Sequence, residues 1–159
     1  MKDIYTILKD LNILYEKCEH AAVFTAEEAD VAYENRTGAR CKNLFLRNKK
    51  GNKHFLVIVE RSKKTDIKKV GEQLGEKHLS FASPERLKKC LGLTPGAVTP
   101  FGLINDTSHE VIVGIDPDLL KEEYVNFHPN MNTATLLVKV TDFTKFLDWA
   151  GNTVIECHI

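Results

Sequence analysis

The apolar run Phe55-Leu56-Val57-Ile58-Val59 constrains the possible folds more than any other stretch of this chain. A strand without alternating polar positions must be covered on both of its faces. Another apolar-rich run, residues 41–46, precedes it, and Asn48-Lys49-Lys50-Gly51-Asn52 lies between the two. Gly51 can adopt the positive φ that a tight connection requires. The sequence therefore predicts a β-hairpin over residues 41–59, with its second strand buried.

Helix-start and helix-stop signals delimit most of the other expected elements. Asp3 is a possible N-cap before helically spaced apolar residues, and Thr25-Ala26-Glu27-Glu28 has the form of a capping box whose helix ends before Gly38. Further helices are expected over 66–74, from 83 to 92 and from 141 to about 151, and further strands over 14–18, 110–115, 135–140 and 153–157. Interleaved helices and strands predict an α/β fold with a mixed sheet and covering helices, in one domain spanning residues 1–159.

The composition excludes several classes of protein. The 22 basic and 22 acidic residues cancel, which argues against a protein that binds duplex DNA over its whole surface. No apolar run approaches the roughly 20 residues of a membrane span, and the N-terminus does not resemble a signal peptide. The four cysteines form no CxxC pair and lack zinc-ligand spacing, so we expect reduced thiols, no metal site and a cytoplasmic protein.

Lys42 is the first candidate for chemistry. It lies at the start of a largely buried strand, where an ammonium group is costly unless it meets water or an anion. A lysine in this position could bind a phosphate or polarise a carbonyl group. The alternative is an ordinary lysine whose charged end reaches the surface.

Two later segments combine backbone constraint with polar side chains. Two glycines and Pro100 within Gly96-Ala97-Val98-Thr99-Pro100-Phe101-Gly102, with Pro95 directly before it, leave backbone groups free to approach a ligand, although a rigid connection would need the same residues. Residues 127–135 place His128, Asn132 and Thr133 among further hydrogen-bonding groups before a strand, which suits ligand recognition but also an ordinary turn.

A basic segment follows the first strand of the hairpin. Acidic residues are sparse there, so the cations could form a local phosphate-binding patch, or simply a solvated face. Its members are Arg47, Lys49, Lys50, Lys53, Arg61, Lys63, Lys64, Lys68 and Lys69.

Together these segments resemble the YbaK/ProX family of prolyl-tRNA editing domains over nearly the whole chain. The resemblance rests on Lys42-Asn43-Leu44, the Gly96-x-x-x-Pro100 loop and His128-Pro129 followed by Asn132-Thr133-Ala134-Thr135. Residues 23–29 and Asn105-Asp106 are also similar to that family. The resemblance implies a compact α/β domain with a mixed, partly barrel-like sheet, which hydrolyses the ester between a wrong amino acid and the terminal adenosine of tRNA.

The resemblance also implies roles for the matching residues. Lys42 is expected to anchor the terminal adenosine or its phosphate. Gly96 and the following Ala97, Val98, Thr99 and Pro100 are expected to hold the aminoacyl end and stabilise charge on the carbonyl oxygen. His128, with Asn132 and Thr133, is expected to line the aminoacyl pocket, and a general-base role for His128 is left open. No cofactor or protein nucleophile is required, because water beside an activated ester suffices once it is positioned.

Asn43 bears on the choice of substrate. A Lys-Asn pair is similar to the branch that clears alanine, which implies a free-standing deacylase of Ala-tRNA(Pro) that binds the acceptor end. Transient contact with prolyl-tRNA synthetase is a further expectation from the resemblance. Two alternatives remain at this point. One is a Cys-tRNA(Pro) deacylase of the YbaK branch, and the other is a non-catalytic RNA- or ligand-binding module on the same fold.

Overall fold

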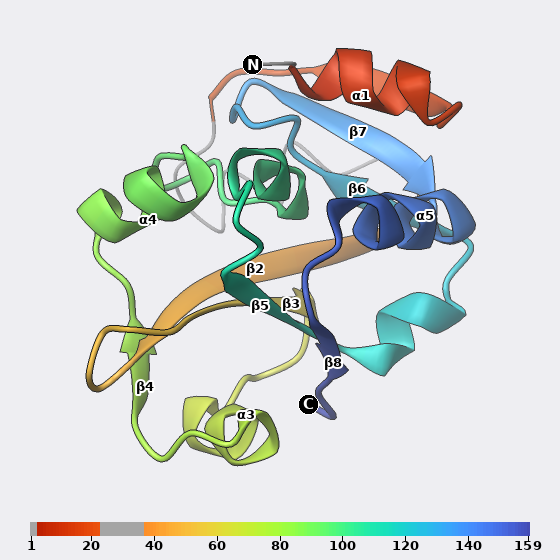
Figure 1. Ribbon diagram of the computed structural model, residues 1–159. Coiled ribbons are helices and arrows are strands. Elements are labelled where there is room, and N and C mark those ends of the chain that lie inside the picture. The colour runs from red at the N-terminus through yellow and green to blue at the C-terminus, as the bar shows by residue number, and fades with distance from the viewer. Residues whose placement is uncertain (1–2, 23–36) are drawn as a thin grey trace.

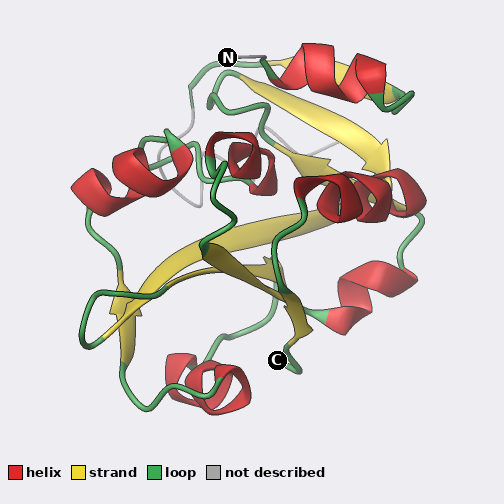
Figure 2. Ribbon diagram, viewed as in Figure 1, coloured by secondary structure: helices red, strands yellow, loops and turns green. Residues whose placement is uncertain are grey.

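The computed structural model describes residues 3–22 and 37–159 (Figure 1). The hairpin is confirmed. Strands β2 (Ala39–Asn48) and β3 (His54–Glu60) pair antiparallel from Cys41–Glu60 to Arg47–His54, and Gly51 has a φ of +72° in the connection. Every residue from Phe55 to Val59 is buried, because helices and loops cover both faces of the sheet at β3 (Figure 2).

The hairpin is the middle of an eight-stranded mixed sheet in the order β1-β7-β6-β2-β3-β5-β8, with β4 paired to β2. The remaining strands are β1 (Tyr15–Glu19), β4 (Leu79–Phe81), β5 (Val111–Ile115), β6 (Tyr124–Phe127), β7 (Ala134–Lys139) and β8 (Val154–Glu156). The β6–β2, β3–β5 and β5–β8 pairs are parallel and the others antiparallel. The predicted mixed α/β class is confirmed. The sheet is not closed into a barrel, since β1 and β8 end it without pairing to each other.

Local signals explain most of the ends of the described helices. Asp3 caps α1 (Ile4–Asp10) by accepting from the Thr6 amide, and Asp66 caps α3 (Ile67–Leu74) in the same way at Lys68. Ser83 caps α4 (Pro84–Leu91), whose first residue is proline. Left-handed glycines at 75, 92 and 151 end α3, α4 and α5 (Val140–Ala150).

The two faces of the sheet are covered unequally. One face carries the larger core, to which α1, α4, α5 and the 3₁₀ segment η1 (Pro100–Asn105) contribute, with a cluster of phenylalanines that includes Phe101, Phe127 and Phe146. The other face carries a smaller core beneath α3, around Leu46, Phe55 and Val70. This two-sided covering accounts for the uninterrupted apolar run of β3.

Some elements differ from the sequence-based expectation. The short strands β4 and β6 and the 3₁₀ segments η1 and η2 (Pro117–Lys121) were not predicted, because three to six residues carry little periodicity. Helix α5 begins at Val140, slightly before the expected start at Thr141. The capping box at Thr25 lies outside the described residues. Within residues 3–22 and 37–159, no helix is long and apolar enough to cross a bilayer.

Candidate active site

The edge of β2 that faces β6 is interrupted next to Lys42 and Asn43. Strand β6 pairs with this edge only at Ala39 and Arg40, and β4 pairs with it only from Leu46 onward. Strand β3 occupies the opposite edge throughout this stretch. The separation of β6 from β4 leaves room beside residues 41–44 for a loop to approach the sheet. The sequence-predicted Lys-Asn pair thus lies where the sheet divides.

The Gly96–Pro100 loop approaches at this place. The side-chain amide of Asn43 donates to the Val98 carbonyl at 3.1 Å. Gly96 adopts a φ of +88°, a conformation that residues with a Cβ rarely take. Beyond Val98, the buried Thr99 hydroxyl accepts from the Phe101 amide at 3.3 Å and starts η1. The loop is therefore bound to β2 at one point and to its own continuation at another.

The other end of the Asn43 side chain is unsatisfied. Its Oδ1 is buried and has no hydrogen-bond partner among the described residues. A buried polar atom without a partner costs free energy, so such an acceptor in a native protein calls for an explanation. An N–H or O–H group of a ligand at this place would satisfy it.

The side chains of Lys42 and Asn43 lie on opposite faces of β2, because successive residues of a strand point to alternate faces of the sheet. Its ammonium donates to the backbone carbonyl of Lys63, just after β3. Arg40 pairs with Asn126, so the two side chains lie on the same face of the sheet. Lys42 and His128 each lie two residues further along and therefore belong to that face as well. Lys42 and the 96–100 loop therefore approach the divided edge from different faces, and no hydrogen bond or ion pair joins the two within residues 3–22 and 37–159.

His128 follows β6 on the face that carries Lys42. Its Nδ1 is 2.9 Å from the Ala134 carbonyl, which assigns the proton to Nδ1 and leaves Nε2 as an acceptor when the ring is neutral. Burial lowers the pKa of His128, the Ala134 hydrogen bond opposes this shift, and the charge of nearby His20 adds to it. The neutral ring, with a lone pair on Nε2, is therefore the form favoured near neutral pH.

Sequence reasoning did not single out His20. Its ring lies 6.0 Å from that of His128, its Nε2 is 2.8 Å from the Thr135 hydroxyl, and its Nδ1 is 2.8 Å from the Ala21 carbonyl. Both of its ring nitrogens are engaged, which distinguishes it from His128. No local signal marks His20, because only the pairing of β1 with β7 brings it to Thr135.

The predicted site residues Asn132 and Thr133 lie in the segment between His128 and β7. Thr133 is exposed and its carbonyl accepts from the His20 amide at 2.9 Å, while Asn132 is half-buried. The neighbouring Asn130 donates to the Phe101 carbonyl at 3.4 Å, which joins the 128–135 block to η1. The structure thus brings the 128–135 block to the end of the Gly96–Pro100 loop, and that loop to β2.

The basic segment after β2 is partly neutralised. Lys63 pairs with Asp116 and Asp118, and Lys53 lies 3.7 Å from Glu76. Arg47 donates to nearby backbone carbonyls. A phosphate-binding role for this segment stays a prediction.

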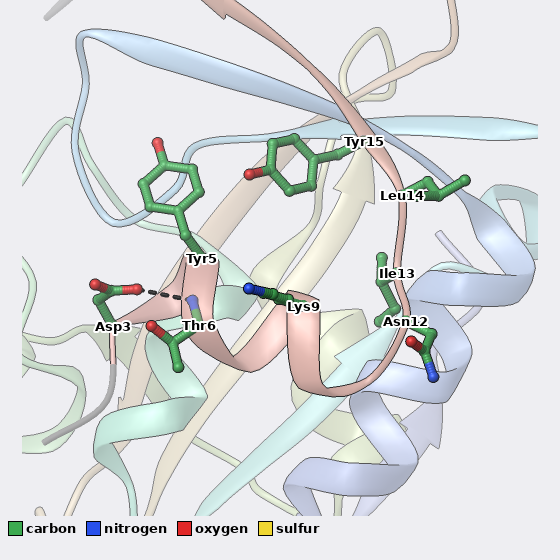
Figure 3. Close-up of a pocket in the computed structure, with 8 residues that line it drawn as sticks. All are labelled: Asp3, Tyr5, Thr6, Lys9, Asn12, Ile13, Leu14 and Tyr15. Atoms are coloured by element: carbon green, nitrogen blue, oxygen red, sulfur yellow. Dashed lines mark hydrogen bonds between the residues drawn. The ribbon is translucent and has the colours of Figure 1, made fainter.

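A separate hollow of about 710 Å³ lies between α1 and β1 (Figure 3). Tyr5 and Tyr15 stand on one side of it with ring centroids 5.9 Å apart, and the Lys17 ammonium is 4.9 Å from the Tyr5 ring. All of its lining residues fall between Asp3 and Tyr15. It brings together no distant parts of the chain and includes none of the predicted site residues.

Comparison with known proteins identifies the relatives of this chain. The chain is 42% identical, over 92% of its length and 89% of the relative, to the prolyl-tRNA editing protein ProX of Acetoanaerobium sticklandii. It is 34% identical to the mouse prolyl-tRNA synthetase associated domain-containing protein 1, over 89% of this chain and 86% of that one. A crystal structure described as a candidate trans-editing enzyme for prolyl-tRNA synthetase superimposes with a TM-score of 0.71 at 22% identity, covering 98% of this chain and 94% of that chain, so the two share a fold.

The matched region contains the divided edge of β2, the 96–100 loop and the 128–135 block. The model of the aminoacyl-tRNA editing domain family matches residues 20–146, which is most of the chain. The chain therefore belongs to the aminoacyl-tRNA editing domain family.

Proposed function

We propose that this protein is a free-standing editing deacylase that hydrolyses the ester of mischarged Ala-tRNA(Pro). The observation that carries the proposal is the hydrogen bond from Asn43 to the Val98 carbonyl, which joins two of the segments that resemble the family's motifs. Family membership and the 42% identity to a prolyl-tRNA editing protein support the reaction class. We expect the whole of residues 1–159 to act as one editing domain.

The reaction needs a positioned water and stabilisation of negative charge. Water attacks the ester carbonyl, and the tetrahedral intermediate releases alanine while the ribose hydroxyl of the terminal adenosine regains its proton. Amide groups of the Gly96–Pro100 loop other than that of Ala97, which donates to the Thr94 carbonyl at 3.1 Å, would stabilise the charge that develops on the carbonyl oxygen. Asn43 Oδ1, which has no partner among residues 3–22 and 37–159, would accept from the substrate's ammonium or ribose hydroxyl.

His128 and Lys42 complete the proposed site from the other face of the sheet. Nε2 of neutral His128 can accept a hydrogen bond from the aminoacyl group or from the attacking water. The Lys42 ammonium would bind the terminal phosphate or ribose, because its one hydrogen bond within the described part of the chain, to the Lys63 carbonyl, uses one of its three N–H donors. Ala97, Thr99, Pro100, Asn132 and Thr133 are proposed to shape the pocket around the amino acid.

Selection of alanine rests on Asn43 and on the size of the pocket. A pocket too small for proline would admit alanine and leave correctly charged tRNA intact. We infer that the substrate is met in the cytoplasm, and that contact with prolyl-tRNA synthetase, if it forms, is transient.

A deacylation panel tests the proposal. Alanine-, cysteine- and proline-charged tRNA(Pro) are incubated with the protein, and the ester remaining is measured over time. We expect rapid loss of alanine, slower loss of cysteine and no loss of proline. Faster loss of cysteine would assign the protein to the cysteine-clearing branch. Failure to hydrolyse any of the three would favour a non-catalytic binding module.

Lys42→Ala tests the assigned site within the same panel. We expect hydrolysis to fall by about a hundredfold or more, since positioning of a reacting group is worth that much. Lys121→Ala, which changes an exposed lysine of η2, is the matched control and should leave the rate unchanged. Full activity of Lys42→Ala would remove Lys42 from the mechanism.

A further inference from the structure

Asp116 is a buried carboxylate directly after β5. Its side chain accepts from the Asp118 amide at 3.0 Å and from the Glu60 amide at 3.3 Å, and its oxygens lie 2.9 and 3.0 Å from the Lys63 ammonium. Its own amide donates to the Ile58 carbonyl at 2.9 Å. A buried carboxylate needs such compensation, and here Lys63 supplies the positive charge. Asp116 thereby joins the ends of β3 and β5 to the turn that follows β3.

Lys63 is held at both its backbone and its side chain. Its amide donates to the Glu60 carbonyl at 3.2 Å, and its ammonium also binds Asp118 Oδ2 at 2.6 Å. The hydrogen bonds that the Lys63 ammonium donates to Asp118 and Asp116 raise the pKa of Lys63, so the ion pairs persist through the neutral range. The turn that carries Lys63 therefore has a defined position relative to the sheet.

The carbonyl of this anchored residue receives the Lys42 ammonium. A free lysine side chain samples many rotamers, and fixing it in advance removes an ordering cost that the substrate would otherwise bear. The contacts lead from Asp116 and Asp118 through Lys63 to Lys42.

We propose that Lys63 and Asp116 are positioning residues that hold the Lys42 ammonium in place for the aminoacyl end of the tRNA. This inference rests on the proposed function, because it takes Lys42 to act on the substrate. Neither Lys63 nor Asp116 touches the reacting atoms in this proposal. Their effect on hydrolysis passes through Lys42.

The kinetic test is a double-mutant cycle on deacylation of Ala-tRNA(Pro) under single-turnover conditions. Lys63→Met should lower kcat/KM by about tenfold. Lys63→Arg, which keeps the ion pairs, should restore most of the rate. In a Lys42→Ala background, Lys63→Met should have no further effect. Additive losses in that background would overturn the proposal.

Two further variants separate positioning from general damage. Lys63→Met with Asp116→Asn removes both charges together, so that no unpaired carboxylate remains buried, and it should lose as much activity as Lys63→Met alone. Lys121→Met removes the other partner of Asp118, at 3.2 Å, without touching Asp116 and should keep full activity. Recovery of the wild-type rate in the doubly neutral variant would count against the proposal.

A readout independent of catalysis is the ammonium resonance of Lys42 in protein labelled with ¹⁵N-lysine, assigned by its disappearance in Lys42→Ala. It should shift or broaden in Lys63→Met and stay in place in Lys121→Met. An unchanged resonance in Lys63→Met would refute the positioning of Lys42 whatever the activity. If the natural protein hydrolyses no aminoacyl-tRNA, the proposed function fails, and this spectrum alone decides whether Lys63 orders Lys42.

Discussion

The Asn43 side chain donates to the carbonyl of Val98 over 3.1 Å, and so links residues 55 positions apart. The bond lies at the stretch of β2 between its pairing with β6, which ends at Arg40, and its pairing with β4, which begins at Leu46. It makes the position of the Gly96–Pro100 loop depend on a polar residue of the central hairpin. Changes at Asn43 should therefore affect the loop and the proposed chemistry together.

Asn43→Ala should slow deacylation of Ala-tRNA(Pro) by about tenfold or more, because the loop loses its bond to β2 and the substrate loses an acceptor. The stability cost should be about 1 kcal/mol, the net contribution of one such hydrogen bond, measured by urea unfolding. Asn105→Ala is the control, since Asn105 also donates to a backbone carbonyl, that of Leu91 at 2.7 Å. The control should lose similar stability and keep its activity. Equal rates in Asn43→Ala and wild type would contradict the prediction.

Gly96→Ala should reduce both stability and activity. Its φ of +88° strains any residue with a Cβ, at a cost of about 1 to 2 kcal/mol. Gly75→Ala provides the comparison, because Gly75 has a φ of +79° at the end of α3 and its added Cβ would meet no atom within 4 Å. Thermal unfolding should show similar losses for the two variants, whereas only Gly96→Ala should slow hydrolysis. A normal rate for Gly96→Ala would separate the loop from the reaction.

Protonation of His128 should destabilise the protein in mild acid. Burial lowers the pKa of His128 in the folded state below the ordinary 6.5 of the unfolded chain. Above that ordinary value both states are neutral, and as the pH falls below it the unfolded chain takes up a proton first, so stability is lost until the folded pKa is passed. The wild-type protein should therefore lose more stability between about pH 7 and about pH 5 than His128→Asn.

His54 is the control for this experiment, because burial lowers its pKa as well, assisted by Arg86. His54→Gln should also flatten the stability profile, but only His128→Asn should change the pH dependence of deacylation. That activity should decline in acid, because a protonated His128 has no lone pair on Nε2. If the pH dependence of the deacylation rate is the same in His128→Asn and in the wild-type protein, the role of His128 is purely structural.

Asp106 should be a residue of the fold and not of the reaction, although it lies in a segment that is similar to the editing family. It is buried and accepts from the amides of Glu110 at 3.1 Å and Val111 at 2.8 Å and from the Asn152 side chain at 2.8 Å. Asp106→Ala leaves these donors without an acceptor and should cost about 3 kcal/mol in urea unfolding. Hydrolysis per folded molecule should be unchanged. A rate loss at full occupancy of the folded state would assign Asp106 to the site instead.

Much of the fold could be predicted from the sequence, because the signals concerned act over a few residues. An N-cap hydroxyl or carboxylate bonds amides two or three positions away, as at Asp3, Asp66 and Ser83, and a left-handed glycine ends its own helix. The apolar run of β3 likewise predicts that the strand is buried, whichever strands pair with it. The family's motifs also lie in the sequence as contiguous stretches, so the resemblance could be recognised there.

Tertiary structure decided the features that join distant segments. The parallel pairs of β3 with β5 and β5 with β8, and the three-residue strand β4, depend on partners that no local pattern encodes. Spacing along the chain could not predict the hydrogen bonds from Lys42 to the Lys63 carbonyl and from Asn43 to the Val98 carbonyl. Nor could it predict that the rings of His20 and His128 lie side by side. The physical reason is that periodicity and capping report on one element at a time, whereas these contacts form only once the register of the whole sheet is set.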